Sequence, residues 1–439
     1  MAKRRKLKKN VKRAMLLLFL LIVVLFYLNF KKHSRDLSEQ DVTSLLYSIV
    51  DNAESDSNVV NKMFAKGMSS DSFNQVLKYQ ADKITSKEEY EKINYNFNKK
   101  LCYKDVEYYL NKINNSDIVD LYVIGHSIDN RNIYGLEIGN GSKVIFLDAN
   151  IHAAETANTH ILIQFMSEVV NMYESGNSDV KNALNEFKLV VMPCINPDGY
   201  EIFTNGIESI SNKELWVYKN KNKINFKNLK SNANGVDINR NFPTQNAGLY
   251  YKSKELLYNV SLEKNTGNQA YFGGYNLGSE PETKAAMYFM LKHYRSVVTY
   301  INLHSQGRVI YSGKPNLSNE FNNLSRKFAS KISNINKYIV YGIESEEVGE
   351  GNDGSATDFM SEIAHEMPFS SKTGRLSSNK YIDPKVDYIV KYPVITLETI
   401  KTYTKNTEIF KDEYYNYGLR KVLFMIVFVF GIMAFYIKK

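Results

Sequence analysis

From about residue 101 onward, apolar positions alternate between the spacing expected of strands and that expected of helices. Residues 118–124 and 132–138 are predicted to form a strand pair around a turn at 129–131. Apolar pairs at 161/162, 165/166 and 169/170 predict an amphipathic helix over residues 156–173. Further strands are predicted at residues 143–150, 187–195, 296–303 and 392–397. This alternation predicts an α/β fold whose sheet is covered by helices on both faces.

Two segments between these elements predict a long loop and the start of a helix. Residues 205–235 are rich in Lys and Asn and are predicted to form a long loop. In the run Ser-Glu-Pro-Glu at 279–282, Ser279 is expected to cap a helix with Glu282 three residues later, which is the pattern of a capping box.

The two ends of the chain carry uncharged apolar runs. Residues 14–30 follow a basic start and precede Lys31 and Lys32 without a small-residue cleavage site, so an uncleaved membrane helix is favoured over a signal peptide. Residues 422–437 are predicted to be a second membrane helix, with a buried core helix as the alternative for so short a run. The Lys/Arg excess before the first run places the N-terminus in the cytoplasm and the intervening domain outside the cell membrane.

The charge of the chain is concentrated in its first residues. Residues 1–13 carry eight Lys and Arg and no acidic side chain, so the formal charge of +9, less these eight, leaves about +1 for the remainder. The basic pI is therefore due to the N-terminal tail, which is expected to be cytoplasmic. No nucleic-acid partner is expected. Residues 31–100 are polar and are predicted to form a helical stalk or cap, or a pro-segment. The two cysteines are Cys102 and Cys194; the second is expected to be a buried thiol, and whether they pair stays open.

Four side chains with catalytic chemistry lie at or after predicted strand ends. His152 and Glu155 form an H-x-x-E pair, which alone is a weak signal, while His304 and Glu398 close later strands. In open α/β sheets ligands bind beyond the carboxyl ends of the strands, so these side chains are expected to share one edge. Two histidines and one carboxylate leave a coordination position of zinc open for water, as catalytic zinc sites do.

Several motifs follow one another in the order of a known family. They are His152-Ala-Ala-Glu155, Asn196-Pro-Asp-Gly-Tyr200, Gly235-Val-Asp-Ile-Asn-Arg-Asn-Phe-Pro243, Ser279-Glu-Pro-Glu-Thr283, His304-Ser305 and Thr396-Leu-Glu398. Over residues 101–412 the chain resembles the zinc metallocarboxypeptidases of funnelin fold, peptidase family M14, and among them the bacterial γ-D-glutamyl-meso-diaminopimelate peptidases. The resemblance implies a mixed, largely parallel sheet.

The resemblance also implies a role for each matching residue. His152, Glu155 and His304 would bind one Zn²⁺, and Glu398 would act as the general base on the attacking water and pass the proton to the leaving amine. Asn239 and Arg240 would hold a substrate carboxylate, for which the planar guanidinium fork is suited. Two further candidates for substrate binding are Lys230, which stands near the place of a family arginine, and Ser305.

One departure concerns a mobile tyrosine of the family. It should precede Gly354, but residues 344–353 contain no tyrosine; Tyr381 and Tyr388 are candidates to replace it.

Three functions remain open at this stage. An outward-facing anchor favours hydrolysis of peptidoglycan stem peptides at the γ-D-glutamyl–diaminopimelate bond. The alternatives are removal of C-terminal residues from ordinary peptides and a non-catalytic peptidoglycan-binding module. The expected partners are the peptide or stem-peptide substrate and the lipid bilayer.

Overall fold

The computed structural model describes residues 81–96, 102–219, 226–244, 272–274, 277–314, 317–341, 354–366, 389–390, 392–400 and 407–427, together with residue 76. All of these belong to one compact unit that covers residues 57–439. The predicted span at 14–30 lies outside the described residues, as do Tyr381, Tyr388 and residues 344–353.

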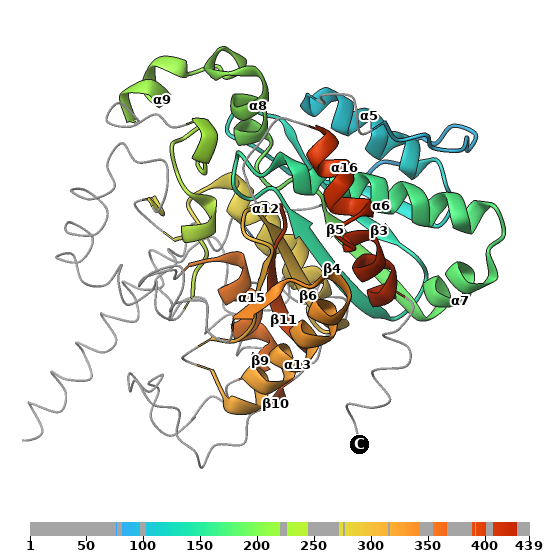
Figure 1. The fold of residues 1–439 in the computed structure, drawn as a ribbon. Coiled ribbons are helices and arrows are strands. Elements are labelled where there is room, and N and C mark those ends of the chain that lie inside the picture. Colours follow the sequence, from blue (N-terminus) through green and yellow to red (C-terminus); the bar gives the residue numbers. More distant parts are fainter. Residues whose placement is uncertain are drawn as a thin grey trace, which may run out of the picture. The chain divides into compact units, whose positions relative to one another are not determined.

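The predicted strands assemble into one sheet (Figure 1). Its nine described strands lie in the order β1-β2-β3-β5-β4-β6-β11-β7-β8. Their bounds are β1 Asp82–Lys83, β2 Val119–His126, β3 Asn132–Ile138, β4 Lys143–Ala149, β5 Phe187–Met192, β6 Val297–His304, β7 Val309–Tyr311, β8 Ile339–Tyr341 and β11 Val394–Glu398. A separate short pair joins β9 His365–Glu366 to β10 Ile389–Val390.

The sheet is mixed, and its parallel part is the centre. Strands β5, β4, β6 and β11 run parallel to one another, while β1, β2 and β3 form an antiparallel flank. On the other side, β7 is antiparallel to β11 and parallel to β8. The expectation of a largely parallel sheet therefore holds for the centre only, because short hairpin connections such as the turn between β2 and β3 produce antiparallel neighbours.

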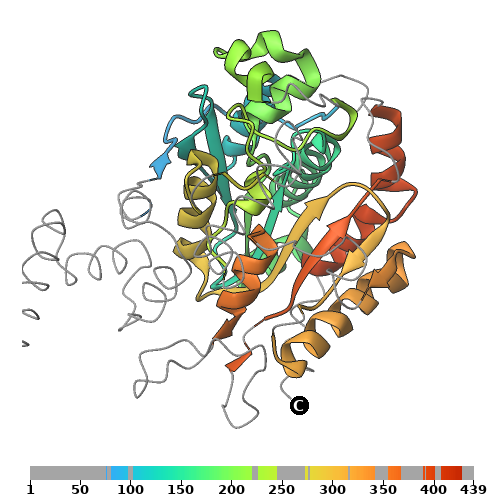
Figure 2. The same cartoon turned by 90° about the vertical axis from the view of Figure 1, so that its left-hand side faces the viewer.

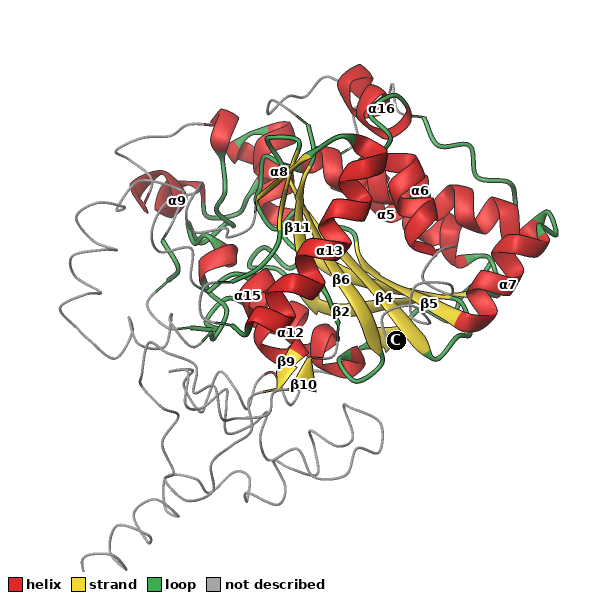
Figure 3. Ribbon diagram, turned by 60° about the horizontal axis from the view of Figure 1, so that its bottom comes forward, coloured by secondary structure: helices red, strands yellow, loops and turns green. Residues whose placement is uncertain are grey.

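Helices cover both faces of this sheet (Figure 3). The bounds of the longer ones are α5 Tyr103–Asn114, α6 Thr156–Glu174, α7 Ser178–Glu186, α8 Pro197–Asn205, α12 Pro281–His293, α13 Asn319–Asn336, α15 Ala356–Ala364 and α16 Thr407–Tyr415. The main apolar core lies on the face covered by α5, α6, α7 and α13. Helices α12 and α15 pack on the opposite face, where Phe289 of α12 meets Phe146 of β4.

Strand alternation decides which side chains meet which face. In β6, Ile301 and Leu303 enter the main core, and in β11 Ile395 and Leu397 do so. Since successive side chains point to opposite faces, His304 and Glu398 belong to the face covered by α12 and α15. The chemistry predicted from the sequence thus lies on the face opposite the largest apolar core.

The start of α12 differs from the prediction. The helix begins at Pro281 with Glu280 as its N-cap, and Ser279 is not the cap. Proline is favoured at the first helical position, which fixes the start there. The Ser279 hydroxyl instead donates to Glu280 Oε1 and accepts a hydrogen bond from Asn241, so it links this helix to the 237–241 turn.

The Lys/Asn-rich segment is not a continuous loop. It contains the 3-10 turns η1 Ile207–Ser209 and η2 Phe226–Asn228 and the helix α9 Lys213–Lys219. The indole of Trp216 is buried, stacks on Phe226 and donates to the carbonyl of Asn232. A single large aromatic residue therefore gives this polar segment a small core that its composition concealed. Figure 2 shows these green elements gathered beyond one end of the sheet.

The described end of the predicted stalk, residues 81–96, contains no helix. It pairs with β2 through β1 and continues along the surface of α5 and α6. Ile93 is buried in the main core, and both Tyr90 and the Ile93 amide donate to Asn171 of α6. At least this part of the segment is therefore an integral part of the α/β fold.

The described part of the second apolar run is also packed. Residues 419–427 are helical, and Val422, Leu423, Ile426 and Val427 are buried in the main core. Phe424 stacks edge-on against Phe165 of α6. Among the described residues, no helix has the length and apolarity needed to cross a membrane. Residues 422–427 are thus packed in the protein core, while residues 428–437 of the predicted membrane helix lie outside the described residues.

Candidate metal centre and catalytic site

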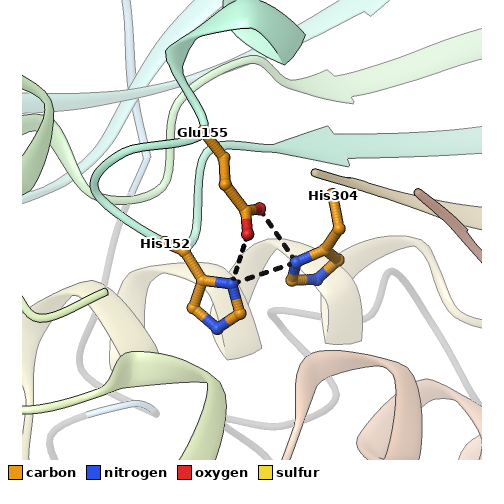
Figure 4. Close-up of side chains that lie close together, drawn as sticks. All are labelled: His152, Glu155 and His304. Atoms are coloured by element: carbon orange, nitrogen blue, oxygen red, sulfur yellow. Dashed lines mark hydrogen bonds and ion pairs between the residues drawn. The ribbon is translucent and has the colours of Figure 1, made fainter. Parts of the chain in front are cut away.

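Three side chains from two strand ends converge on one point (Figure 4). His152 Nδ1 lies 2.8 Å from Glu155 Oε1, and His304 Nδ1 lies 3.0 Å from Glu155 Oε2. The two Nδ1 atoms are 3.2 Å apart. All three residues are buried, with 4%, 2% and 2% of their surfaces exposed for His152, Glu155 and His304.

This donor set fits zinc. Two ligand atoms held tetrahedrally at about 2.0–2.1 Å from Zn²⁺ lie roughly 3.3 Å apart, close to the separations observed. Burial alone would raise the pKa of Glu155, but the adjacent His152 and His304 lower it to about 2, so the carboxylate is ionised. Burial also lowers the pKa of His304, which favours the neutral imidazole needed for coordination.

Two of the three ligands lie on the backbone segment that joins β4 to α6. His152 follows β4, and Glu155 is the N-cap of α6, so both ligands sit on one strand-to-helix junction as the spacing predicted. The Ala153 and Ala154 amides donate to the carbonyls of Lys230 and Leu229. Asn196 caps α8 and also donates to the carbonyl of Ile151. The Asn-Pro-Asp-Gly motif therefore acts as architecture that holds the ligand loop.

A fourth residue, the acidic Asp237, lies behind the three ligands. Asp237 Oδ1 lies 3.4 Å from His152 Nε2 and accepts a hydrogen bond from the Asn239 amide. Although burial opposes it, the neighbouring His152 and Arg240 hold the pKa of Asp237 below its ordinary value. Our residue-by-residue assignments did not include Asp237, although it lies in the Gly-Val-Asp-Ile-Asn-Arg run.

The Asn239–Arg240 pair follows directly on this support. Asn239 Oδ1 accepts a hydrogen bond from the Ala356 amide at the start of α15, which leaves its Nδ2 as the group to donate to a substrate. Arg240 is 8% exposed. Gly273 and Gly354 both lie against the Arg240 carbonyl, and a Cβ at Gly354 would stand 2.7 Å from that oxygen. The turn that presents Arg240 is therefore clamped by two glycines.

Glu398 lies beside the metal ligands through strand register. It is paired with His304 across the parallel strands β11 and β6, so their side chains share a face at about 4.8 Å between backbones. Its Oε2 is buried and has no hydrogen-bond partner in the described part of the chain. Burial and the negative charge of Glu155 raise the pKa of Glu398, and Lys230 opposes that rise. A desolvated carboxylate next to an electrophilic centre is suited to proton transfer.

Lys230 and Ser305 have different surroundings. The positive charge of Lys230 acts to lower the pKa values of Glu398, Asp237 and His304, so this lysine lies near the catalytic centre. Ser305 is 2% exposed, and its hydroxyl accepts from Asn158 and approaches Thr399 at 3.3 Å. Ser305 thus belongs to a buried network that fixes the end of β6; substrate contact by Ser305 stays a prediction.

Three other histidines lie apart from the centre. His160 bonds Tyr95 at 2.7 Å, His293 lies 3.2 Å from Glu137, and the side chain of His126 is exposed. Both Cys102 and Cys194 are free thiols, and Cys194 is buried as expected.

Comparison with known proteins relates these residues to a family. The family model of zinc carboxypeptidases (Peptidase M14) matches residues 106–398, which include His152, Glu155, His304 and Glu398. Gamma-D-glutamyl-L-diamino acid endopeptidase 1 of Lysinibacillus sphaericus is 33% identical over 202 residues, 44% of this chain and 47% of that protein. The catalytic chain of human carboxypeptidase N is 27% identical over 213 residues, 46% of this chain and 41% of that protein. The chain thus matches less than half the length of these relatives.

A solved structure agrees on the fold. Carboxypeptidase A from Helicoverpa armigera superposes with a TM-score of 0.53 at 18% identity, covering 78% of this chain and 77% of that one.

Proposed function

Because the chain belongs to the zinc carboxypeptidase family, we propose that it hydrolyses peptidoglycan stem peptides at the bond between a γ-D-glutamyl residue and a diamino acid. Peptidase chemistry follows from the family and from the intact His152, Glu155 and His304 set, which binds one zinc ion. The choice of bond is supported by the relative from Lysinibacillus sphaericus, whose name specifies a γ-D-glutamyl-L-diamino acid endopeptidase.

The reaction needs a water, a base and a place for negative charge. When bound, Zn²⁺ acts as a Lewis acid and lowers the pKa of a water molecule to about 7. Glu398 accepts a proton from the attacking water and returns it to the nitrogen as the carbon–nitrogen bond breaks. Lys230 supplies positive charge next to the carbonyl oxygen, in the place of an arginine fork. Asn239 Nδ2 and Arg240 bind a carboxylate on the leaving residue.

The single observation that carries the catalytic part is the adjacency of Glu398 and His304. The Glu398 carboxylate lies one strand away from a metal ligand, and its buried Oε2 has no hydrogen-bond partner among the described residues. Buried polar groups without partners are costly, which favours a functional reason for its retention.

The location of the enzyme forms part of the proposal. A basic N-terminal tail followed by an apolar run would anchor the chain in the cell membrane with its N-terminus in the cytoplasm. The catalytic domain would then face the cell wall, where stem peptides occur.

A second function has its own support. Asn239 and Arg240 would hold a terminal carboxylate, which is supported by the bond from the Ala356 amide to Asn239 Oδ1 that leaves Nδ2 to donate, and the human relative is named as a carboxypeptidase. Removal of single C-terminal residues from ordinary peptides is therefore the competing activity.

Mass spectrometry of the products separates these functions. Full-length, zinc-loaded protein in detergent is incubated with stem peptides and with linear peptides that vary at the C-terminus. Release of diamino-acid-containing fragments supports the proposal, whereas loss of single C-terminal residues alone replaces it with the carboxypeptidase. Glu398→Gln should abolish either activity while retaining zinc. Glu137→Gln, which removes a carboxylate paired with Lys188 and Lys292 away from the centre, should retain activity.

A further inference from the structure

The side chain of Asn232 connects the segment before the Asn-Arg pair to the start of α12. It is 0% exposed, and its Oδ1 accepts hydrogen bonds from the backbone amides of Asn234 and Val236 at 3.0 and 3.1 Å. Its Nδ2 donates to Glu280 Oε2 at 2.9 Å and to Glu282 Oε2 at 3.0 Å. These four bonds use both donors and both acceptors of an asparagine amide, so its orientation is fixed from two sides.

The backbone around Asn232 forms a closed turn. Its amide donates to the Val236 carbonyl at 2.9 Å, and the Gly235 amide donates to the Asn232 carbonyl at 3.1 Å. Gly235 has a φ of 74°, in the left-handed region that glycine adopts without steric cost. The buried indole of Trp216 donates to the same Asn232 carbonyl at 3.2 Å. The side chain of Asn232 therefore holds a turn of defined shape, and a shift of this side chain would be passed on to the whole turn.

This turn leads directly into the residues beside the metal ligands. Asp237 follows Val236, and its Oδ1 lies 3.4 Å from His152 Nε2. The same oxygen accepts a hydrogen bond from the Asn239 amide at 3.1 Å, and the Asp237 carbonyl accepts one from the Arg240 amide at 2.9 Å. The position of Asn239 and Arg240 relative to the ligands thus depends on where the turn lies.

The far end of this segment is fastened to the same region. Asn241 Oδ1 accepts from the Glu280 amide at 3.1 Å, and the Asn241 carbonyl accepts from the Gly278 amide at 2.6 Å. Residues 232–241 are therefore bonded at both ends to residues 278–282. At the Asn232 end, the acceptors are side-chain carboxyl groups that burial has removed from water.

Both carboxyl groups depend on the Asn232 amide as a donor. Glu280 is 3% exposed and Glu282 is 0% exposed. Burial and the negative charges of Asp198 and Glu280 raise the pKa of Glu282. Removing one partner of a buried hydrogen bond leaves the other desolvated and unsatisfied, which costs more than the bond itself contributes. Loss of the Asn232 amide is therefore expected to let the turn and the start of α12 move apart.

We propose that Asn232 is a positioning residue, which sets the place of Asn239 and Arg240 relative to the metal centre. It acts through its bonds to Glu280 and Glu282 and through the turn. It does not bind the substrate, because its amide is fully used within the protein. The inference deepens the proposed function and rests on it for the substrate carboxylate that the pair binds. A displacement of about 1 Å caused by a residue far from the reacting atoms can cost about 100-fold in rate.

The test measures the preference for a substrate carboxylate. Two peptide series, one with a γ-D-glutamyl–diamino acid bond and one with ordinary α-peptide bonds, each end in a free carboxylate or in a primary amide. With full-length zinc-loaded protein, kcat/KM should favour the carboxylate by at least about 100-fold, since a site built to bind a polar group rejects analogues that lack it. Asn232→Leu should reduce this preference to below about tenfold by raising KM for the carboxylate peptides, while kcat/KM for the amidated peptides changes by less than about threefold.

Two further variants separate positioning from folding. Asn232→Asp keeps the oxygen that accepts from the turn and removes the donor to the carboxyl groups, so it should also lower the preference, and it decides the test if Asn232→Leu does not fold. Asn171→Leu is the matched control, because Asn171 of α6 likewise holds a separate segment through Tyr90 and Ile93. It should lower stability and leave the preference unchanged. Thermal unfolding and zinc content are measured for every variant.

Each outcome decides one of the two proposals. An equal fall in kcat/KM for carboxylate and amide peptides shows a structural role and overturns the positioning role of Asn232. A preference that both Asn232 variants leave intact, that Asn171→Leu lowers equally, or that the unmodified protein lacks also overturns it.

The bond that is cleaved is read separately from this preference. Cleavage of the α-peptide series alone rejects the γ-D-glutamyl bond, and the preference is then measured in that series. If neither series is cleaved, Kd values of the same peptides are compared for Glu398→Gln protein with and without Asn232→Leu. A carboxylate preference in binding that Asn232→Leu removes supports the positioning role, and an unchanged preference overturns it.

Discussion

Replacing Asp237 by asparagine tests whether the centre depends on its supporting carboxylate. The substitution keeps the size of the side chain and its oxygen, so the hydrogen bond from the Asn239 amide can persist. It removes the charge that lies 3.4 Å from His152 Nε2. The His152 ring would then lose the partner that fixes its orientation toward the metal.

The size of the effect follows from this distance. At an effective dielectric constant of 20, two unit charges 3.4 Å apart interact by roughly 5 kcal/mol, which is a ceiling because the imidazole is neutral when it binds a metal. Partners that orient metal-binding histidines are worth about 10–100-fold in affinity. We therefore expect Asp237→Asn to weaken zinc binding by about 10–100-fold, or about 1.4–2.8 kcal/mol.

The assay is a competition titration with a chelator of known zinc affinity, followed by activity at saturating zinc. Most of the lost activity should return when zinc is in excess. Glu137→Gln serves as the control, because it removes a buried charge paired with Lys188, Lys292 and His293 and should leave the zinc Kd within about twofold. An unchanged Kd in Asp237→Asn would refute the supporting role of this carboxylate.

Three further predictions concern the substrate turn, acid stability and the C-terminal helix. Gly354→Ala places a methyl group against the Arg240 carbonyl and should raise KM by about tenfold with little change in kcat, measured by steady-state kinetics. Burial lowers the pKa of His160 from 6.5 to about 3, so the unfolded chain takes up the extra proton as the pH falls through that window. Stability should drop by about 1.4 kcal/mol per pH unit there, and denaturant titrations should show a flatter profile for His160→Gln. Leu423→Ala should cost about 2–5 kcal/mol of unfolding free energy, while the exposed Lys421→Ala should cost little; equal small effects would contradict the packing of this helix.

The sequence predicted well those elements whose apolar period was undisturbed. The pair β2 and β3, the helix α6 and the strands that carry His304 and Glu398 all occur within a few residues of their expected bounds. The ligand set was also predictable, because His152 and Glu155 stand one turn apart on a single junction. Local spacing is sufficient for such features, since they depend on a few neighbouring residues.

Other features depend on contacts that spacing does not report. The α9 helix is organised by the burial of Trp216, and Ser279 is drawn away from its expected cap by Asn241 from a distant turn. Residues 422–437 were predicted to be a membrane helix, with a core helix as the alternative, because apolarity alone does not distinguish lipid from a protein core; the described part, residues 422–427, packs in the core. The contact of Phe424 with Phe165 supplies the missing partner.

Register explains why catalytic and supporting residues come from the same strands. Strands β6 and β11 are paired at five successive positions, so Glu398 meets His304 only if Leu397 meets Leu303 in the core beneath. A slip of one residue would turn Glu398 into the apolar face and Leu397 toward the metal. The core therefore specifies the distance between base and metal ligand, and the same pairing brings Thr396, Asn302 and Asp148 into one row behind them. The metal ligand and the carboxylate beside it thus depend on one alignment, because a strand can reposition one of these groups only by moving the others.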